Sequence, residues 1–341
     1  GYSSLMSKDA EKQKRVHDTA PSEVFAKFMG EGWATLPLTD LGESPIVKNC
    51  VERRKVLSAA FKGLRIVLPS GADKVRSNDT YYQYRPHSAF AYYTGVQGVE
   101  ANPDAVLVLE PNGDAHDSVL FIMPRSTRDT DAFYRDAKYG ELWVGRRYTT
   151  DEAQQRYKIE TRSVSELEKF LSDKKPAVVI RGEDKKVDAL IAANEKDGDL
   201  EIFTSEQRLI KDEYEVDQLQ QAVDATGRGF EDMIKVLQKA TKHERGERVV
   251  EGAFYARARA EGNDLGYNTI AAAGSHACVL HWVRNDGQVK NGELMLIDAG
   301  IEMDSYYTAD ITRTLPVNGK FTAAQRELYM LVYNAQKAGF A

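Results

Sequence analysis

The chain has 341 residues, of which 46 are basic and 52 acidic, giving a net charge of −6. This length exceeds what one hydrophobic core usually supports, so we expect two domains. The balanced charge provides no strongly basic face, which argues against binding nucleic acid or an anionic membrane. Two cysteines cannot form a disulfide framework, and together with an N-terminus that lacks the apolar core of a secretory signal they predict a cytoplasmic protein.

The first 48 residues are mostly polar and form a predicted N-terminal extension with one helical pattern, SEVFAKFMGEGW. Residues 1–5 precede Met6 and are set aside as residues that could come from a cloning vector. Over residues 49–204, helical and strand patterns alternate. A helix in VERRKVLSAAF leads to the strand RIVLPS, AVLVLEP and SVLFIMP flank the turn formers PNGDAHD, and PAVVIRG reads as a buried strand. This alternation predicts an α/β domain with a mixed sheet.

Residues 205–341 form the second predicted domain. It begins with a long charged helix from Ser205 to Lys239, and its apolar stripe consists of Leu209, Val216, Leu219, Ala222, Phe230, Ile234 and Leu237. A second helix ends at Gly262, and four strand-like segments follow: YNTIAAAG, ACVLHWV, ELMLIDAGIEM and YYTADITRTLPV. The last segment, TAAQRELYMLVYNAQKAGF, is helical, with Thr322 as its N-cap.

Two aspartates, Asp298 and Asp310, lie in segments that otherwise resemble buried strands. If the two segments form a hairpin whose turn is centred on Asp304, these aspartates face each other, provided the connection has an odd length or a bulge. Two carboxylates so close repel each other unless a cation compensates them. A pair of divalent ions about 3.5–4 Å apart fits such a wall of oxygen ligands. Thr312 and Thr314 share the face of Asp310 and could donate hydrogen bonds to the ligands.

A second explanation remains open at this point. Asp298 could begin a turn at DAG, and Asp310 could pair with Arg313.

If the aspartates do bind metal, their carboxylate oxygens favour manganese, magnesium or calcium, and they tolerate zinc and cobalt. Cys278 could be read as a nucleophile beside His281, but a spacing of three in a strand points them to opposite faces. We therefore expect Cys278 to be a small buried residue.

The run from GYNTIAAAGSHACVLHW through IDAG to DITRTLPVNGKFTAAQRELY resembles the metal-site half of aminopeptidase P, the Xaa-Pro aminopeptidase family. YYQYRPHSAFAYYTGVQGVE and ELWVGRRY resemble the N-terminal domain of that family, so the resemblance extends from about residue 45 to residue 341. It implies that residues 205–341 form the first half of a catalytic domain with the pita-bread fold. It also implies a homodimer or homotetramer.

The resemblance assigns roles to four residues. Asp298 and Asp310 match metal-binding carboxylates, the second of which bridges two ions, so it implies two divalent ions, with manganese preferred over zinc or cobalt. His281 matches a catalytic histidine that contacts the substrate and stabilises the tetrahedral intermediate, and Tyr267 matches a tyrosine at the substrate site. The implied reaction uses a metal-bound hydroxide to release the first residue of peptides with proline in second place.

The family completes its metal site with a histidine and two glutamates that lie beyond the DITRT strand. The sequence after DITRT offers no histidine and a single glutamate, Glu327. We therefore expect this chain alone to bind metal weakly and to be inactive. Two other functions remain open: a prolidase that cleaves Xaa-Pro dipeptides, and a non-catalytic pita-bread protein that binds peptides.

Overall fold

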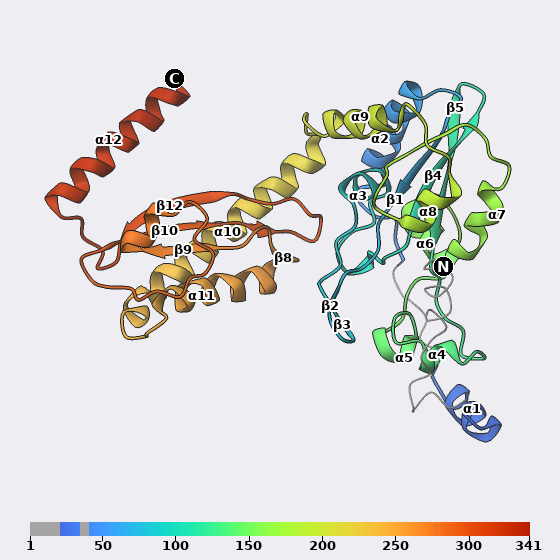
Figure 1. The fold of residues 1–341 in the computed structure, drawn as a ribbon, viewed down its shortest axis with the longest axis horizontal. Coiled ribbons are helices and arrows are strands. Elements are labelled where there is room, and N and C mark those ends of the chain that lie inside the picture. Colours follow the sequence, from blue (N-terminus) through green and yellow to red (C-terminus); the bar gives the residue numbers. More distant parts are fainter. Residues whose placement is uncertain (1–20, 35–40) are drawn as a thin grey trace, which may run out of the picture.

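A computed structural model describes residues 21–34 and 41–341, so the prediction for residues 1–5 falls outside the described residues. Figure 1 shows two parts, a sheet with its surrounding helices and a smaller group of strands and helices, with the long helix α10 (Glu213–Ala240) leading from one to the other. Among the helices of residues 21–34 and 41–341, none is both long and apolar enough to cross a lipid bilayer.

The first part contains nine α-helices and two 3₁₀ helices among the described residues. The α-helices are α1 (Glu23–Gly30), α2 (Val47–Ala60), α3 (Ser88–Thr94), α4 (Ala132–Arg135), α5 (Glu141–Val144), α6 (Thr150–Tyr157), α7 (Leu167–Leu171), α8 (Lys185–Leu190) and α9 (Asp197–Gln207). The 3₁₀ helices are η1 (Gly98–Glu100) and η2 (Val164–Glu166).

The sheet of the first part is mixed, as predicted. Its strands are β1 (Arg65–Pro69), β4 (Val106–Asn112), β5 (Ala115–Ile122), β6 (Glu160–Ser163) and β7 (Ala177–Val179), in the order β6-β5-β4-β1-β7. The β4–β5 hairpin confirms the turn predicted from PNGDAHD, and its register runs from Val106–Phe121 to Asn112–Ala115. A separate small ribbon pairs β2 (Val75–Ser77) with β3 (Thr80–Tyr81).

Alternation along β1 divides the first part into two cores. Ile66 and Leu68 join α2, α3, α6 and α9 on one face of the sheet, whereas Val67 joins α7 and α8 on the other. Helices on both faces explain why the strand RIVLP is buried along its whole length.

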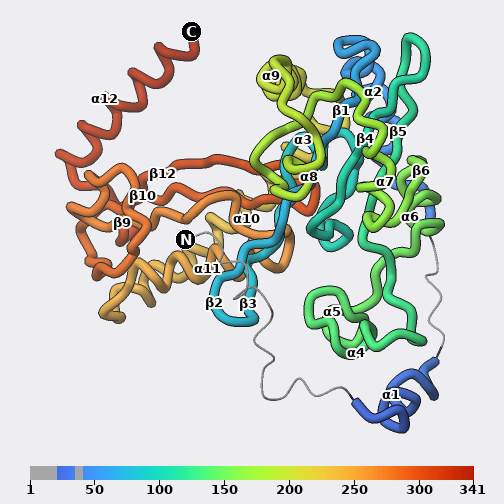
Figure 2. Tube along the Cα trace, turned by 45° about the vertical axis from the view of Figure 1, so that its right-hand side comes forward, coloured from blue at the N-terminus to red at the C-terminus, as the bar shows by residue number. Residues whose placement is uncertain are grey.

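The second part contains α10, α11 (Gly246–Glu261), η3 (Gly274–Cys278) and α12 (Ala323–Phe340). Its antiparallel sheet has the order β12-β10-β9, with β9 (Ile270–Ala273), β10 (Leu294–Ala299) and β12 (Ile311–Pro316), while β11 (Ile301–Glu302) pairs with β8 (Asp264–Leu265). Figure 2 shows α10 and α11 side by side beneath this sheet and α12 extending away from it.

One face of β10 packs on the helices. Met295, Ile297 and Ala299 belong to the core that β10 shares with α10 and α11. Because side chains alternate along a strand, Leu294, Leu296 and Asp298 point to the opposite face. The candidate aspartate therefore lies on the face of the sheet that these helices leave uncovered.

Two of the elements predicted for the second part are wrong. The helix expected from Ser205 to Lys239 is interrupted, since α9 ends at Gln207 and α10 begins at Glu213 after the N-cap Asp212. Leu209, Val216 and Ile234 are exposed. Of the predicted stripe, Ala222, Phe230 and Leu237 are buried. The proposed domain boundary at residue 205 falls in the last turn of α9.

The second wrong prediction is the strand ACVLHWV, which is the end of η3 followed by a turn. The predicted burial of Cys278 is wrong as well, since this segment does not join the sheet and Cys278 is exposed. The predicted N-cap of the last helix is confirmed, since the Thr322 side chain accepts a hydrogen bond from the backbone N–H of Gln325.

The two cysteines should differ in reactivity. Cys50 is 1% exposed, and burial raises the pKa of its thiol to about 11, so very little thiolate forms at pH 8. A disulfide reagent such as DTNB at pH 8 should therefore react rapidly with one thiol of the native chain and with the second only after unfolding. Cys278→Ser should remove the rapid phase, whereas two rapid thiols in the native protein would contradict the buried position of Cys50.

Candidate metal centre

The hairpin that carries the two aspartates has a different register from the predicted one. Asp298 faces Thr312, and the pairing continues through Ala299–Ile311 to a bridge between Glu302 and Thr308. The turn is thus centred on Ser305, one residue later than predicted, and the direct pairing of Asp298 with Asp310 is wrong. Asp310 instead lies just before β12, diagonally across from Asp298 on the same face.

The carboxylates nevertheless converge on a common group. The Tyr267 hydroxyl lies 2.5 Å from Oδ1 of Asp298 and 2.9 Å from Oδ1 of Asp310. The separation of the two carboxylate oxygens is therefore at most the sum of these two distances. The sequence resemblance placed these three residues at one site, and the structure brings them together. Their roles in binding metal or substrate stay predictions.

The electrostatics of this cluster favour a cation. No Lys or Arg among the described residues forms an ion pair with Asp298 or Asp310, and Arg313 donates to the backbone oxygen of Thr312 instead, so the alternative pairing of Asp310 with Arg313 is wrong. Burial and the two neighbouring carboxylates raise the pKa of the Tyr267 phenol, which keeps its proton at neutral pH. The single phenolic proton is shared between the carboxylates of Asp298 and Asp310, so the electrostatic repulsion between these carboxylates is only partly relieved.

The predicted hydrogen bonds from the two threonines are not formed. Within the described part of the chain, neither Thr312 nor Thr314 donates to the aspartates. Both line a cavity of about 750 Å³ that lies between the uncovered face of the sheet and α12. Their function as supporting groups stays a prediction.

The structure does not bring His281 to the aspartates. It lies in an exposed turn after η3, and no side-chain hydrogen bond or ion pair links it to Asp298 or Asp310 among the described residues. The predicted strand fails because the free edge of β9 is occupied. The backbone N–H of Ala271 donates to the Asn285 side chain and that of Ala273 to Glu247.

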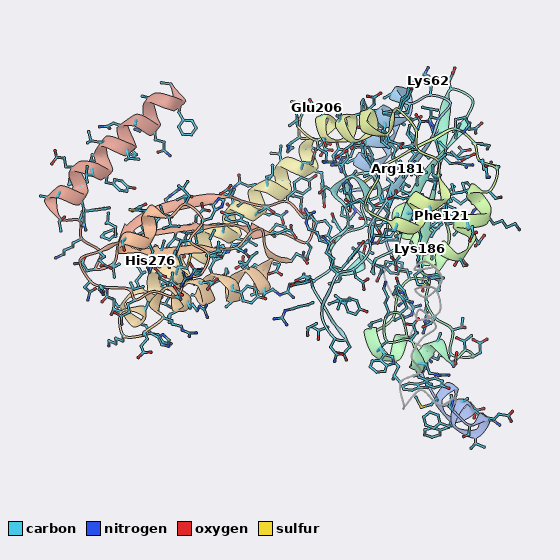
Figure 3. All side chains as sticks on the ribbon, in the orientation of Figure 1. Lys62, Phe121, Arg181, Lys186, Glu206 and His276 are labelled. Carbon is cyan, nitrogen blue, oxygen red and sulfur yellow. The ribbon has the colours of Figure 1, made fainter. Side chains whose placement is uncertain are left out.

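Glu247 organises this segment from the first turn of α11. Its fully buried carboxylate accepts hydrogen bonds from the backbone N–H groups of Ala273 and Gly287, from Nε1 of Trp282 and, at 2.8 Å, from the His276 ring. His276, labelled in Figure 3, also stacks on Trp282 with the ring centroids 3.9 Å apart. These contacts hold both ends of the segment that carries His281.

The importance of Glu247 was not inferred from the sequence, although a signal for it exists. Glu247 continues the buried stripe of α11, which contains Val250, Phe254 and Ala258 at helical spacing. An acid in an apolar stripe predicts a buried carboxylate that must find several donors. This pattern predicts that Glu247 is buried and bonded to several donors, but it does not identify the segment that supplies them.

The donor set suits a hard divalent ion but is small. Carboxylate and phenol oxygens are ligands for magnesium, manganese or calcium. Among residues 21–34 and 41–341, however, no group of three or more His, Cys, Asp and Glu side chains is arranged to hold a metal. The two aspartates therefore fit part of a metal site.

Comparison with known proteins identifies the family. Residues 50–179 match the family described as Aminopeptidase P, N-terminal domain, and residues 217–341 match Metallopeptidase family M24. The chain is 48% identical to Xaa-Pro aminopeptidase 1 of Streptomyces coelicolor, an alignment that covers 94% of this chain and 65% of that protein. It is 42% identical to Xaa-Pro aminopeptidase 2 of the same organism, in an alignment that covers 97% of this chain and 69% of that protein. The chain belongs to the aminopeptidase P family.

Solved structures agree with this assignment. Aminopeptidase P of Escherichia coli with the inhibitor Pro-Leu superimposes with a TM-score of 0.71 at 30% identity, covering 87% of this chain and 68% of that one. A zinc-substituted form of the same E. coli enzyme in complex with product gives the same values. The predicted fold class, an α/β N-terminal domain followed by a pita-bread domain, is thereby confirmed. The chain spans only about two thirds of the length of these aminopeptidase P relatives.

Replacing Glu247 tests its anchoring role. Glu247→Gln keeps the shape but replaces one acceptor oxygen by a donor that faces N–H groups, so we expect the free energy of unfolding to fall by roughly 2–4 kcal/mol. Urea denaturation followed by tryptophan fluorescence measures this change. The exposed neighbour Glu244 provides the matched control, and Glu244→Gln should change stability by less than about 0.5 kcal/mol. Equal effects of the two substitutions would contradict the assignment.

Proposed function

We propose that this chain contributes the N-terminal domain and the two-aspartate wall of the metal site to an aminopeptidase that releases the first residue of Xaa-Pro peptides. The observation that carries this proposal is the convergence of Asp298 and Asp310 on the Tyr267 hydroxyl, with no basic side chain of the described residues paired to either acid. The family membership supports the same reaction. The competing binding-protein and prolidase hypotheses lead to different experimental results.

Asp298 and Asp310 would hold two divalent ions, of which manganese is the expected one. Bound there, the ions would polarise the scissile carbonyl and lower the pKa of a coordinated water. The free amine of the substrate would lie near Asp298. The Tyr267 hydroxyl, which lies 2.5 Å from Asp298 and 2.9 Å from Asp310, would orient an acceptor oxygen of the substrate beside them.

His281 would act from its exposed turn. We propose that its imidazole contacts the substrate, as the family resemblance implies, while Glu247 and Asn285 hold the ends of its segment. We also propose a homodimer or homotetramer and a cytoplasmic location, the latter because the two cysteines are free.

Metal binding by the 341-residue chain should be weak, since two carboxylates are few ligands for a hard ion. Titration with Mn²⁺, followed by the electron paramagnetic resonance signal of the free ion, should detect one class of weak saturable sites. Asp298→Asn and Asp310→Asn should each lower the affinity roughly tenfold or more, because each removes a charged ligand. Glu327→Gln on the exposed surface of α12 should leave it unchanged. Unchanged Mn²⁺ binding in both aspartate variants would refute the metal site.

Activity should be measured on the protein at the length at which its organism makes it. With Mn²⁺ present, it should release the first residue of an Xaa-Pro-Xaa tripeptide, and Asp310→Asn should lower kcat/KM by at least about 100-fold, as expected for a lost metal ligand. Turnover of Xaa-Pro dipeptides alone would identify a prolidase. Binding of the tripeptide without cleavage, at saturating Mn²⁺, would identify a peptide-binding protein.

A further inference from the structure

The hairpin that carries the aspartates is held at its closed end by a side chain from the other part of the molecule. Figure 1 shows this end, the turn at residues 303–307, pointing toward the first part. Arg85 lies in the segment between β3 and α3 of the first part. Its Nε donates to a carboxylate oxygen of Glu302, just before the turn, over 2.9 Å. This ion pair links the first part directly to the hairpin.

Glu302 is the buried member of this ion pair. Its side chain is 9% exposed, and among the described residues Arg85 is the only cationic group paired with it. Its other carboxylate oxygen accepts a hydrogen bond from the Asn263 side chain at 3.0 Å, and its backbone oxygen accepts one from the Asn263 N–H. These neutral contacts fix the position of Glu302, and the contact with Arg85 balances its charge. A buried carboxylate that loses its cation is strongly destabilising.

The same guanidinium contacts the turn on its other side. It lies over the ring of Tyr306, 5.0 Å from the ring centroid, where the negative face of an aromatic ring attracts a cation. Tyr306 is 9% exposed and has a φ of 68°, a left-handed conformation that a bulky residue keeps only when the surrounding contacts maintain it. Arg85 therefore contacts the chain both before and after Ser305, the centre of the turn.

The backbone of the first part also lies against the turn. A side-chain carbon at Gly98, the first residue of η1, would lie 3.1 Å from Cβ of Asp304. The turn is thus in contact with the first part through Gly98 as well as through Arg85.

Backbone pairing connects this turn to the two acids of the candidate metal site. Glu302 and Thr308 form an antiparallel bridge next to the turn. Asp298 lies four residues before Glu302, and Asp310 lies two residues after Thr308. The connections are short, so a displaced turn moves both acids. Because two neighbouring carboxylates repel each other, a fixed turn favours the arrangement in which they stay close.

We propose that Arg85 is a positioning residue of the metal site, which acts from the first part by fixing the turn between the two aspartates. In the described structure it forms no hydrogen bond or ion pair with either acid. Its contacts with Glu302 and Tyr306 keep Asp298 and Asp310 close enough to share a cation. This role rests on the metal-binding function proposed above, and it makes the affinity for metal depend on a side chain of the N-terminal domain.

Titration of the 341-residue chain with Mn²⁺, followed by the electron paramagnetic resonance signal of the free ion, tests this role. Arg85→Gln should weaken binding about three- to tenfold, as contacts outside a binding site commonly do. Arg85→Lys keeps the charge and should retain most of the affinity. The matched control is Arg125→Gln, which breaks an ion pair of 2.8 Å with Glu141 within the first part and should leave the affinity unchanged.

Removing both charges separates the effect of the ion pair from a general loss of stability. In the double variant Arg85→Gln and Glu302→Gln, no buried carboxylate lacks its cation, and the new amide oxygen can still accept from Asn263. The double variant should therefore bind Mn²⁺ more tightly than Arg85→Gln alone. If Arg85→Gln does not fold, the double variant decides the question, and its affinity should still lie below that of the unmodified chain.

Hydrogen exchange without metal, measured by mass spectrometry, reports the state of the hairpin directly. In Arg85→Gln the amides of residues 299–310 should exchange faster than in the unmodified chain, whereas those of β1 and β4 should not change. Unchanged exchange in the hairpin would overturn the role of Arg85. Mn²⁺ binding that is equal in the unmodified chain and in folded Arg85→Gln would overturn this role alone, whereas no Mn²⁺ binding to the unmodified chain would refute the metal site itself and this role with it.

Discussion

The candidate site depends on one close approach between two backbone segments, at Gly300 and Ala309. A side chain at Gly300 would collide with the backbone oxygen of Ala309 and approach Cε1 of Tyr267 to 3.0 Å. Because glycine has no side chain, the two strands of the hairpin can approach each other closely at this position. Gly300 lies two residues after Asp298, and Ala309 directly precedes Asp310. The ring of Tyr267 packs against the hairpin at the same glycine, and its hydroxyl contacts both acids. The close approach of the two backbones therefore leaves room for the Tyr267 ring beside both acids.

Much of the fold could be predicted because it rests on local patterns. Alternating apolar residues and turn formers identified the β4–β5 hairpin, and helical spacing identified α2, α11 and α12. The hairpin of the second part was also predictable, but its register was not. Asp304 and Ser305 are both good turn formers, so local preference cannot decide which of them is the centre. A shift of one residue in the centre moves the facing pair by two, from Asp310 to Thr312.

The environment of His281 could not be predicted, because it depends on distant side chains. The apolar run ACVLHWV suits a strand, yet the carboxylate of Glu247 and the amide of Asn285 bind the N–H groups that a neighbouring strand would need. These partners lie on another helix and in a later loop, so no local pattern reveals them. The break between α9 and α10 has a similar origin, since Asp212 ends the helical run by capping α10 and pairing with Arg53.

Arg53 has a wider consequence for the molecule. It belongs to α2 of the first part, is 4% exposed, stacks on Tyr92 and donates to the residue that caps α10. Glu215, in the first turn of α10, is buried beside it. If the first part unfolded, the Glu215 carboxylate would lose the nearby guanidinium of Arg53. The N-cap of α10, Asp212, would lose its ion pair with the same guanidinium. Two regions that look like independent domains are therefore expected to melt as one cooperative unit.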